Sequence, residues 1–371
     1  MTARERVMKT FRLLPGRPDR VPLQFDLCEQ LLQHFSDELN IPLRVTPNMY
    51  EDVSWRISGN EIRLALGSEI VVTGTAVAAD FEPEYLPDGR WRNEYGMLMR
   101  QGTLYKEVDR HPLEHVETVD DLANFSLPDM SLPGRLDDAN RLVGTYHDNY
   151  FIVGGMGVTL MSLVQQLVGM EKLFTDMALG SEYLPELTER VVDYQIDQGR
   201  RLIDCGVDAL FIGDDFGSQT SLLFSRQMFL DYWKRHYARM CREFKTVKPD
   251  VILVLHSDGA ITPLLEDVHE IGFDVLNPIQ PGVPGQSAQK MKQDWGHIFS
   301  FWGGLDEQYL IPKAPEEELD ATIAATMKIL GRDGGYVAAP AHIIQPDVAP
   351  ERVVAFVECC RRNAHVYGSA R

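Results

Sequence analysis

Short runs of β-branched and apolar residues alternate with helical patterns along the chain. Eight such runs are predicted to be strands: 21–25, 70–73, 151–154, 209–212, 251–255, 275–278, 298–302 and 335–339. Amphipathic segments lie between the later runs, and two of them begin with proline and acidic residues, at Pro315 and Pro350. This alternation predicts an α/β fold, the (β/α)8 TIM barrel, with residues 1–371 forming a single domain.

Two features refine this prediction. A doubly wound sheet would show a similar alternation, but it carries a glycine-rich phosphate loop after its first strand, and the residues here are Phe25-Asp26-Leu27-Cys28. Residues 78–108 depart from the βα pattern, because alternating side chains flank the turn sequence Pro87-Asp88-Gly89-Arg90. We therefore expect a closed barrel with an N-terminal β-hairpin excursion at its mouth.

Composition narrows the classes of partner. The chain has 36 basic and 55 acidic residues, a formal net charge of -19, which disfavours binding to nucleic acid. No apolar run has the length of a signal peptide core or a membrane span. We expect a cytoplasmic protein without membrane association. No motif specifies its oligomeric state, for which a homodimer is one candidate.

Polar residues follow the predicted strands, where barrel enzymes carry their catalytic groups. They are Asp26, Gly155-Met156-Gly157, Asp214-Asp215, His256-Ser257-Asp258-Gly259, Gln280, Gly303-Gly304-Leu305-Asp306 and His342. The active site is therefore expected at the ends of the strands.

The strongest of these motifs is His256-x-Asp258 at the end of an apolar strand, which puts both side chains on one side of the chain. His342 follows the eighth strand and would lie across the same mouth. Two neutral imidazoles and one carboxylate suit Zn2+ with one position open for substrate. The alternative is that His256 and His342 bind substrate directly while Asp258 orients them, and spacing alone leaves both interpretations open.

Asp214 and Asp215 could supply a general acid or base, since adjacent carboxylates raise the pKa of at least one of the two. They could equally be a helix cap and its solvated neighbour. The open loop that follows favours a catalytic role for Asp215. Candidate substrate-binding residues are Asp26, Met156, Gln219 and Gln280. The alternatives are core packing for Met156 and a structural turn amide for Gln280. Asp306 is expected to cap a helix.

Several motifs together resemble the superfamily of uroporphyrinogen decarboxylase and the corrinoid-linked methyltransferases. They are Pro18-Asp19-Arg20-Val21-Pro22, Gly206-Val207-Asp208, His256-Ser257-Asp258-Gly259, Gly272-Phe273-Asp274-Val275-Leu276-Asn277, Gly303-Gly304, Gly334-Gly335-Tyr336 and the segment from His342 to Pro346-Asp347. The resemblance runs nearly from end to end. It implies the same barrel, with an active site at its mouth.

The resemblance is weaker to the decarboxylases themselves. They carry an arginine-rich stretch after the first strand, whereas this chain has the acidic run Leu23 to Glu29. They also carry an Asp after the second strand, where this chain offers Glu69, and a Tyr in the third loop, where Leu163 stands. An acidic first loop disfavours a substrate that bears many carboxylates. Porphyrinogen decarboxylation is therefore not expected.

The methyltransferase branch is the closer resemblance. Its zinc is held by His-x-Cys after the fifth strand and Cys after the eighth, and His256, Asp258 and His342 fall on these positions. Since both thiolates are replaced, a thiol substrate is in doubt and an O-demethylase type of reaction is implied. A small methylated substrate, such as a methyl ether, would give its methyl group to the Co(I) corrinoid of a partner protein, because this chain has no cobalamin-binding fingerprint. Asp215 would position or protonate the departing group.

Two other classes of function remain open. One is a decarboxylase or lyase of a small carboxylic acid, with His342 and Asp215 as proton donors. The other is a degenerate barrel that serves as a binding subunit. Bound zinc that is lost on substitution of His256 or His342 would favour methyl transfer, whereas activity that survives chelation would favour acid–base chemistry.

Overall fold

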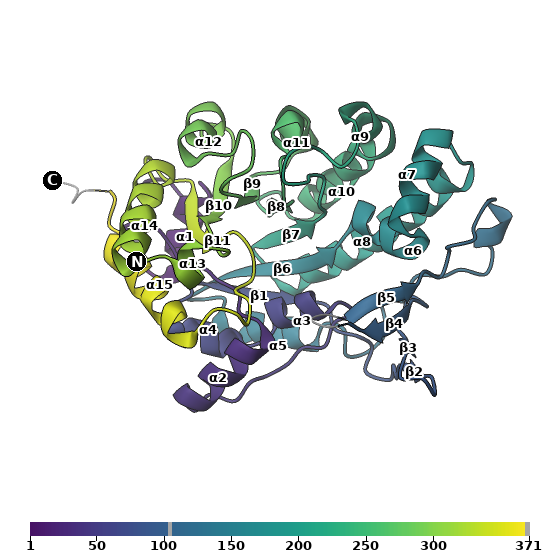
Figure 1. Ribbon diagram of the computed structural model, residues 1–371, viewed down its shortest axis with the longest axis horizontal. Helices are drawn as coiled ribbons and strands as arrows, with labels where there is room; N and C mark the ends of the chain where they lie inside the picture. Colours follow the sequence, from purple (N-terminus) through teal and green to yellow (C-terminus); the bar gives the residue numbers. More distant parts are fainter. Residues whose placement is uncertain (103–105, 368–371) are drawn as a thin grey trace.

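The centre of the molecule is a curled sheet of seven parallel strands (Figure 1). The computed structural model describes residues 1–102 and 106–367. The strands lie in the order β1 (Ile70–Gly74), β6 (Phe151–Val158), β7 (Ala209–Gly213), β8 (Ile252–His256), β9 (Val275–Ile279), β10 (Ser300–Leu305) and β11 (Tyr336–Pro340). Each overlaps one of the eight runs predicted from the sequence, although β6 and β10 extend past the predicted ends and include Gly155-Met156-Gly157 and Gly303-Gly304-Leu305.

Residues 21–25, the predicted first strand, form an extended segment with a single bridge, between Leu23 and Ala338 of β11. The Ala338 N–H donates to Pro22 O at 2.9 Å, and the N–H of Glu69, which precedes β1, donates to Leu23 O at 2.8 Å. Regular pairing is limited here because Pro22 has no N–H to donate. The segment nevertheless bonds next to both edges of the sheet, which is consistent with a TIM-type barrel.

Inward-facing strand residues fill the interior as one apolar cluster. Its members alternate along the strands: Ile70, Val72, Phe151, Val153, Ala209, Phe211, Ile252, Val254, Val275, Trp302, Val337 and Ala339. Helix α1 (Ala3–Thr10) covers the end where the strands begin, and Val7 and Phe11 join the cluster. The Phe11 ring lies 5.5 Å from that of Phe151 and 6.4 Å from that of Trp302. The barrel interior is therefore a packed core, and the active site of such a fold lies at the other end, where the strands end.

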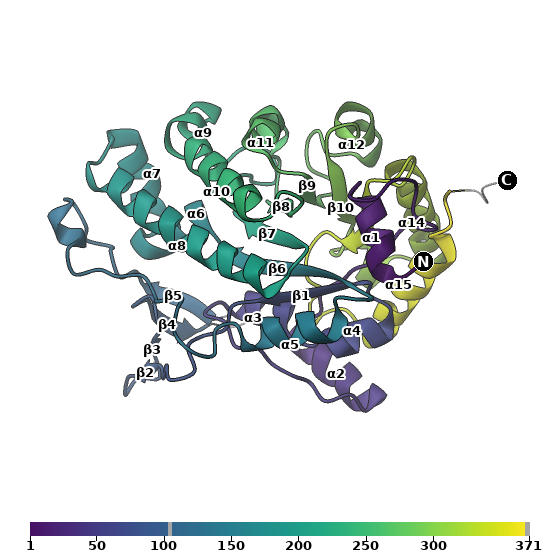
Figure 2. The ribbon, with the colours of Figure 1, turned by 180° about the vertical axis from the view of Figure 1, so that it is seen from behind.

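Helices surround the sheet (Figures 1 and 2). They are α2 (Glu29–Leu39), α3 (Glu51–Ile57), α4 (Asn60–Leu66), α5 (Asp137–Tyr146), α6 (Leu160–Val168), α7 (Met170–Leu179), α8 (Tyr183–Cys205), α9 (Arg226–Tyr232), α10 (Lys234–Val247), α11 (Leu265–Ile271), α12 (Ala288–Trp295), α13 (Leu310–Lys313), α14 (Glu316–Leu330) and α15 (Pro350–Asn363), with 3-10 turns at Asp120–Leu122 and Thr262–Leu264. Helices α14 and α15 begin where Pro315 and Pro350 predict. Within the residues that the structure describes, every helix is too short or too polar to cross a bilayer.

The excursion after β1 is larger than the single hairpin expected from the sequence. It forms a four-stranded antiparallel sheet of β2 (Glu84–Tyr85), β3 (Trp91–Arg92), β4 (Leu98–Gln101) and β5 (Lys106–Arg110). A buried ion pair of 3.0 Å between Arg135 and Glu94 and a 2.8 Å hydrogen bond between the hydroxyls of Tyr95 and Tyr194 join it to the rest of the fold. Since it follows the end of β1, it emerges on the side of the barrel where the strands end.

Candidate metal and substrate site

His256 is the last residue of β8 and continues its inward alternation after Ile252 and Val254. The imidazole therefore enters the mouth of the barrel, where its ring lies 5.2 Å from that of Phe211. Burial, and after it the positive charge of Arg56, lowers the pKa of His256. A neutral ring at pH 7 is the form that can bind a metal ion.

Asn277 of β9 determines which nitrogen of His256 faces the mouth. Its amide nitrogen donates to the Trp302 carbonyl at 3.4 Å, so that its Oδ1 atom faces His256 Nδ1 at 2.6 Å. His256 Nδ1–H then donates to Asn277, and the lone pair of Nε2 is left to point away from Asn277. In a metal-binding histidine, the ring nitrogen that does not bind the metal usually donates its N–H to a hydrogen-bond acceptor of this kind.

His256, Asp258 and His342 converge as the spacing predicts. Each offers a ligand atom, and these atoms all lie within 4.8 Å of one another. The His256 and His342 rings are 6.3 Å apart. Burial, followed by the charge of Asp215, raises the pKa of Asp258 to about 6, so that the carboxylate is mainly ionised at pH 7. Ligand atoms of a tetrahedral zinc ion with bonds of about 2.1 Å lie roughly 3.4 Å apart, so small side-chain movements would bring these three residues to one ion.

The loop that carries Asp258 is held by side-chain amides. Gln280 Oε1 accepts from the Gly259 N–H at 2.7 Å, and Gln286 Nε2 donates to the Gly259 carbonyl at 2.7 Å. Gly259 has φ +82°, and a Cβ atom there would lie 2.5 Å from the backbone of Gly217. Gln280 also donates to Gln219 Oε1 at 3.2 Å. These contacts agree with the interpretation of Gln280 as a structural amide. Gln219 and Gln280 nevertheless both border the cleft described below.

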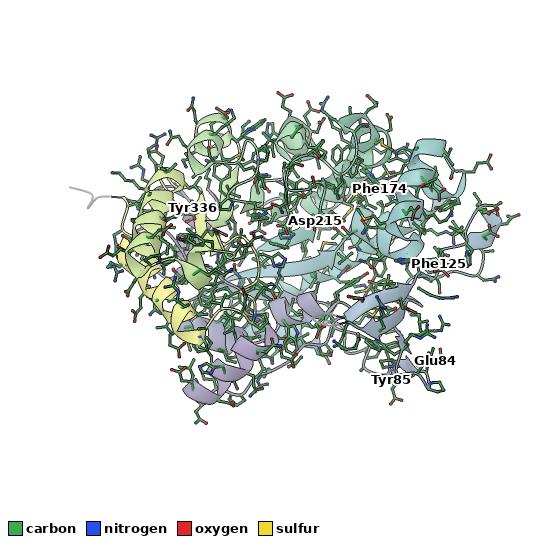
Figure 3. The ribbon with its side chains drawn as sticks, in the orientation of Figure 1. Glu84, Tyr85, Phe125, Phe174, Asp215 and Tyr336 are labelled. Atoms are coloured by element: carbon green, nitrogen blue, oxygen red, sulfur yellow. The ribbon has the colours of Figure 1, made fainter. Side chains whose placement is uncertain are left out.

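The two adjacent aspartates have different environments. Asp214 is buried and accepts from the backbone N–H groups of Leu160 and Ser162 and from the hydroxyls of Thr159 and Tyr237. It therefore caps α6. Asp215 is exposed, near the centre of Figure 3, and its Oδ1 accepts from the Asp258 N–H at 2.8 Å. Asp215 thus touches the candidate metal loop, whereas Asp214 is structural.

A cleft of about 440 Å3 opens beside two of the three converging residues, Asp258 and His342. Its lining includes Gln219, Asp258, Gln280, Glu307, Lys313 and His342. Burial raises the pKa of Glu307 to about 7, with further contributions from Asp306 and Asp258. Sequence reasoning missed Glu307, although the adjacent Gly303-Gly304-Leu305-Asp306 motif marks the end of the strand. Asp306 was expected to cap a helix; it accepts from the N–H groups of Gln308 and Leu310 in the turn before α13, but the N-cap residue of that helix is Tyr309.

The first loop is not the uncompensated acidic loop that the sequence suggests. Asp26 pairs with the buried Arg63, and its second oxygen lies 3.4 Å from Arg56 Nε. Both arginines come from helices α4 and α3 rather than from the first loop. Asp26, Arg56 and His342 line a small recess of about 20 Å3 that shares His342 with the cleft. Arg56 is a second residue that sequence reasoning missed.

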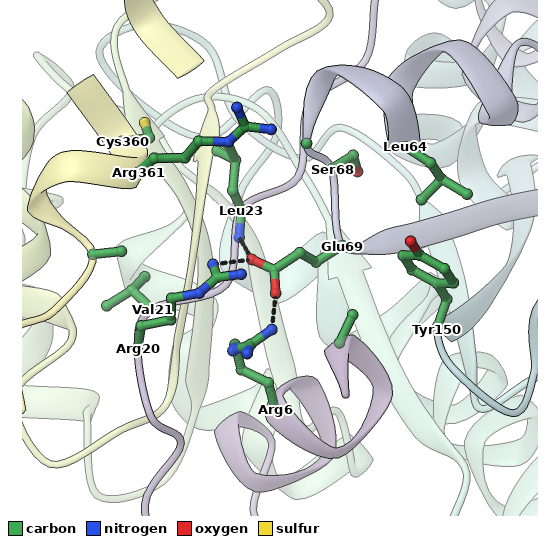
Figure 4. A pocket seen from close by; sticks show the side chains of 13 residues that line it. Arg6, Arg20, Val21, Leu23, Leu64, Ser68, Glu69, Tyr150, Cys360 and Arg361 are labelled. Carbon is green, nitrogen blue, oxygen red and sulfur yellow. Dashed lines mark hydrogen bonds and ion pairs between the residues drawn. The ribbon is translucent and has the colours of Figure 1, made fainter. Parts of the chain in front are cut away.

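Three further expectations change. Met156 is 4% exposed within the hydrophobic core, which favours its packing role. Leu163 is fully buried within α6 rather than part of a loop. Glu69 precedes β1, so it lies at the opposite end of the barrel from the site and is no counterpart of an Asp after that strand. Figure 4 shows its surroundings, a cavity of about 210 Å3 in which Glu69 accepts from Arg6 and Arg20.

Comparison with known proteins gives three findings. The sequence model described as "Uroporphyrinogen decarboxylase (URO-D)" matches residues 102–363. Over 188 residues the chain is 26% identical to a uroporphyrinogen decarboxylase of Vesicomyosocius okutanii, covering 50% of each protein. It is also 21% identical over 271 residues to the methylcobamide:CoM methyltransferase MtbA of Methanosarcina mazei, covering 72% of this chain and 75% of that protein. The match thus spans about half the length of the decarboxylase.

Among solved structures, a methyltransferase from Methanosarcina mazei superimposes with a TM-score of 0.70 at 20% identity. The superposition covers 98% of this chain and 99% of that one. At this identity the likeness establishes the fold. It extends over the N-terminal part of the chain, which the sequence model of the family does not cover.

Proposed function

The chain belongs to the uroporphyrinogen decarboxylase family, and within it we propose that this protein catalyses metal-assisted transfer of a methyl group from a small methylated substrate to the Co(I) corrinoid of a partner protein. The observation that carries the proposal is the convergence of His256, Asp258 and His342, with ligand atoms within 4.8 Å of one another. Similarity to MtbA over 72% of the chain supports the corrinoid acceptor. A methyl ether is the methyl donor that we favour.

The three residues fit a zinc ion by their chemistry. His256 is neutral and its Nδ1–H is engaged by Asn277, Asp258 is mainly ionised, and His342 borders both the recess and the cleft. A zinc ion held by them would supply Lewis-acid polarisation of the substrate heteroatom, which makes that atom a better leaving group. Asn277, Gln280 and Asp215 position this set, since each bonds to His256 or to the loop that carries Asp258.

Loss of the methyl group leaves an alkoxide or phenoxide that needs a proton. Asp215 is one candidate donor. Glu307 is the second, because it lines the cleft together with Asp258 and His342 and its pKa of about 7 matches a general acid that works at neutral pH.

The test measures methylation of free Co(I) cobalamin by its change in absorption spectrum. The methyl donors offered are a panel of methoxylated aromatics and methylamines. We expect methylation in zinc-loaded protein and loss of both zinc and activity in His256→Ala and His342→Ala. A zinc content unchanged by both substitutions would refute the proposed ligand set.

A second candidate function is decarboxylation of a small carboxylic acid, supported by the similarity to uroporphyrinogen decarboxylase over half of the chain. His342 and Asp215, or Glu307, would then protonate the carbanion that remains when carbon dioxide departs. Carbon dioxide release that survives chelation of zinc, without methylation of cobalamin, would favour this function over methyl transfer.

A further inference from the structure

Arg56 lies beside the candidate metal site but has no role in holding it. Its side chain is 16% exposed, and its guanidinium carbon lies 5.0 Å from the centre of the Phe211 ring. The ring of His256 lies 5.2 Å from the same Phe211 ring. Arg56 and the first residue of the proposed ligand set are therefore both in contact distance of one aromatic side chain, at the open end of the barrel.

The positive charge of Arg56 is only partly balanced. Asp258 is close enough for the charge of Arg56 to act on it, but Asp26 is the acid that lines the recess with Arg56, and its Oδ1 already accepts from Arg63 and from Gln24. Arg63 is 2% exposed and donates to Ser58 O at 2.9 Å, so it belongs to the fold. Arg56 reaches Asp26 at 3.4 Å, which is longer than a strong N–H···O bond. Two guanidinium groups thus share one carboxylate.

The surroundings of Arg56 make this surplus charge significant. Besides Asp26 and His342, the recess that it lines is bounded by the apolar side chains of Val72, Phe211 and Trp302 and by the neutral amides of Gln24 and Asn277. Charges interact more strongly in such a poorly hydrated place than in water. The recess volume of about 20 Å3 accommodates a group the size of one water molecule, comparable to one carboxylate oxygen. Since His342 lines both recess and cleft, a molecule in the cleft could extend a carboxylate into the recess.

We propose that Arg56 anchors a carboxylate of the substrate, so that the substrates of this protein are small methylated acids rather than neutral methyl ethers or methylamines. The inference rests on the proposed function for the methyl group, but the anion subsite stands on the recess and its charge. The guanidinium has several N–H donors, so that it can donate to one carboxylate oxygen in the recess while it remains beside Asp26. The carboxylate would compete with Asp26 for Arg56, while the methylated end faces His256, Asp258 and His342.

The experiment compares an acid with its uncharged analogue. Binding of 3-methoxybenzoate and 3-methoxybenzamide, and of methoxyacetate and methoxyacetamide, is measured by isothermal titration calorimetry on the full chain with and without zinc. We expect at least one acid to bind at least tenfold more tightly than its amide in either form. Arg56→Met should reduce this preference to less than threefold, with binding of the amide little changed, and Arg56→Lys should give an intermediate value.

Arg100→Met is the matched control, because Arg100 is 55% exposed on β4 and pairs with Glu107 away from the recess. Its preference for the acid should equal that of the wild type. Equal binding of acid and amide by the wild type, binding of neither, or a preference that persists in Arg56→Met would each overturn the inference. If Arg56→Met does not fold, the wild-type comparison and Arg56→Lys decide. Failure of the proposed function gives a different result: the acid still binds preferentially, but cobalamin is not methylated.

Discussion

Replacement of Asn277 by leucine tests the proposed zinc site without touching a ligand. Asn277 Oδ1 lies 2.6 Å from His256 Nδ1 in a buried position, and leucine has a similar size but no acceptor. Partners of this kind are worth about 10- to 100-fold in metal affinity, or about 1.4–2.7 kcal/mol. We expect the zinc dissociation constant of Asn277→Leu to rise by that factor, measured by competition with a chelating indicator at pH 7.5.

Asn277→Asp is the matched control for this substitution. Both variants lose the amide donor that reaches the Trp302 carbonyl at 3.4 Å, but aspartate keeps an oxygen acceptor for His256. Zinc affinity within threefold of the wild type is expected for Asn277→Asp. An affinity of Asn277→Leu that also stays within threefold, in protein that unfolds cooperatively, would refute the argument that Asn277 orients a zinc-binding His256.

Three further substitutions test other parts of the site. Gly259→Ala should lower the free energy of unfolding by about 1–3 kcal/mol in urea titrations, because φ is +82° and the new Cβ would lie 2.5 Å from Gly217; stability equal to wild type would contradict this contact. Asp26→Asn should cost about 3–5 kcal/mol, since the buried Arg63 loses its charged partner, and a loss below 1 kcal/mol would show that Arg63 is otherwise compensated. If Glu307 donates a proton, kcat/KM should fall as pH rises through about 7, and Glu307→Gln should lose this limb and about 100-fold in rate; an unchanged pH profile would exclude Glu307 as the acid.

The parts of the site that the sequence predicts are those set by local rules. Strand alternation alone directs His256 into the barrel after Ile252 and Val254, and the rule that strand ends share one mouth brings His342 to it. Seven strands were predictable because their runs of apolar and β-branched residues are local sequence patterns. The exception, residues 21–25, pairs irregularly because Pro22 interrupts its hydrogen bonding.

The parts that the sequence does not predict depend on how distant elements pack. Arg56 comes from the short helix α3, which rests on the end of β6 because Gly157 leaves room for Val53; a Cβ atom at Gly157 would lie 2.6 Å from that side chain. The hydrophobic pattern of the sequence does not predict this contact between α3 and β6. Glu69 shows the opposite error, in which a plausible residue type was assigned to the wrong end of its strand. A charged residue next to a strand can be assigned to the active site only when it is known whether it precedes or follows that strand.

The composition of the ligand set constrains which atom it can activate. One imidazole and two thiolates, as the resemblance implies for the thiol-methylating relatives, would cancel the two positive charges of a zinc ion. His256, Asp258 and His342 supply only one negative charge, so the ion and its ligands would retain one positive charge; Arg56 adds a positive charge nearby and Asp215 a negative one. A site with net positive charge and hard nitrogen and oxygen ligands stabilises a departing alkoxide or phenoxide more than a soft thiolate. The same charge that favours an oxygen leaving group also favours an acidic substrate, which is why the ligand set and the Arg56 recess lead to one substrate class.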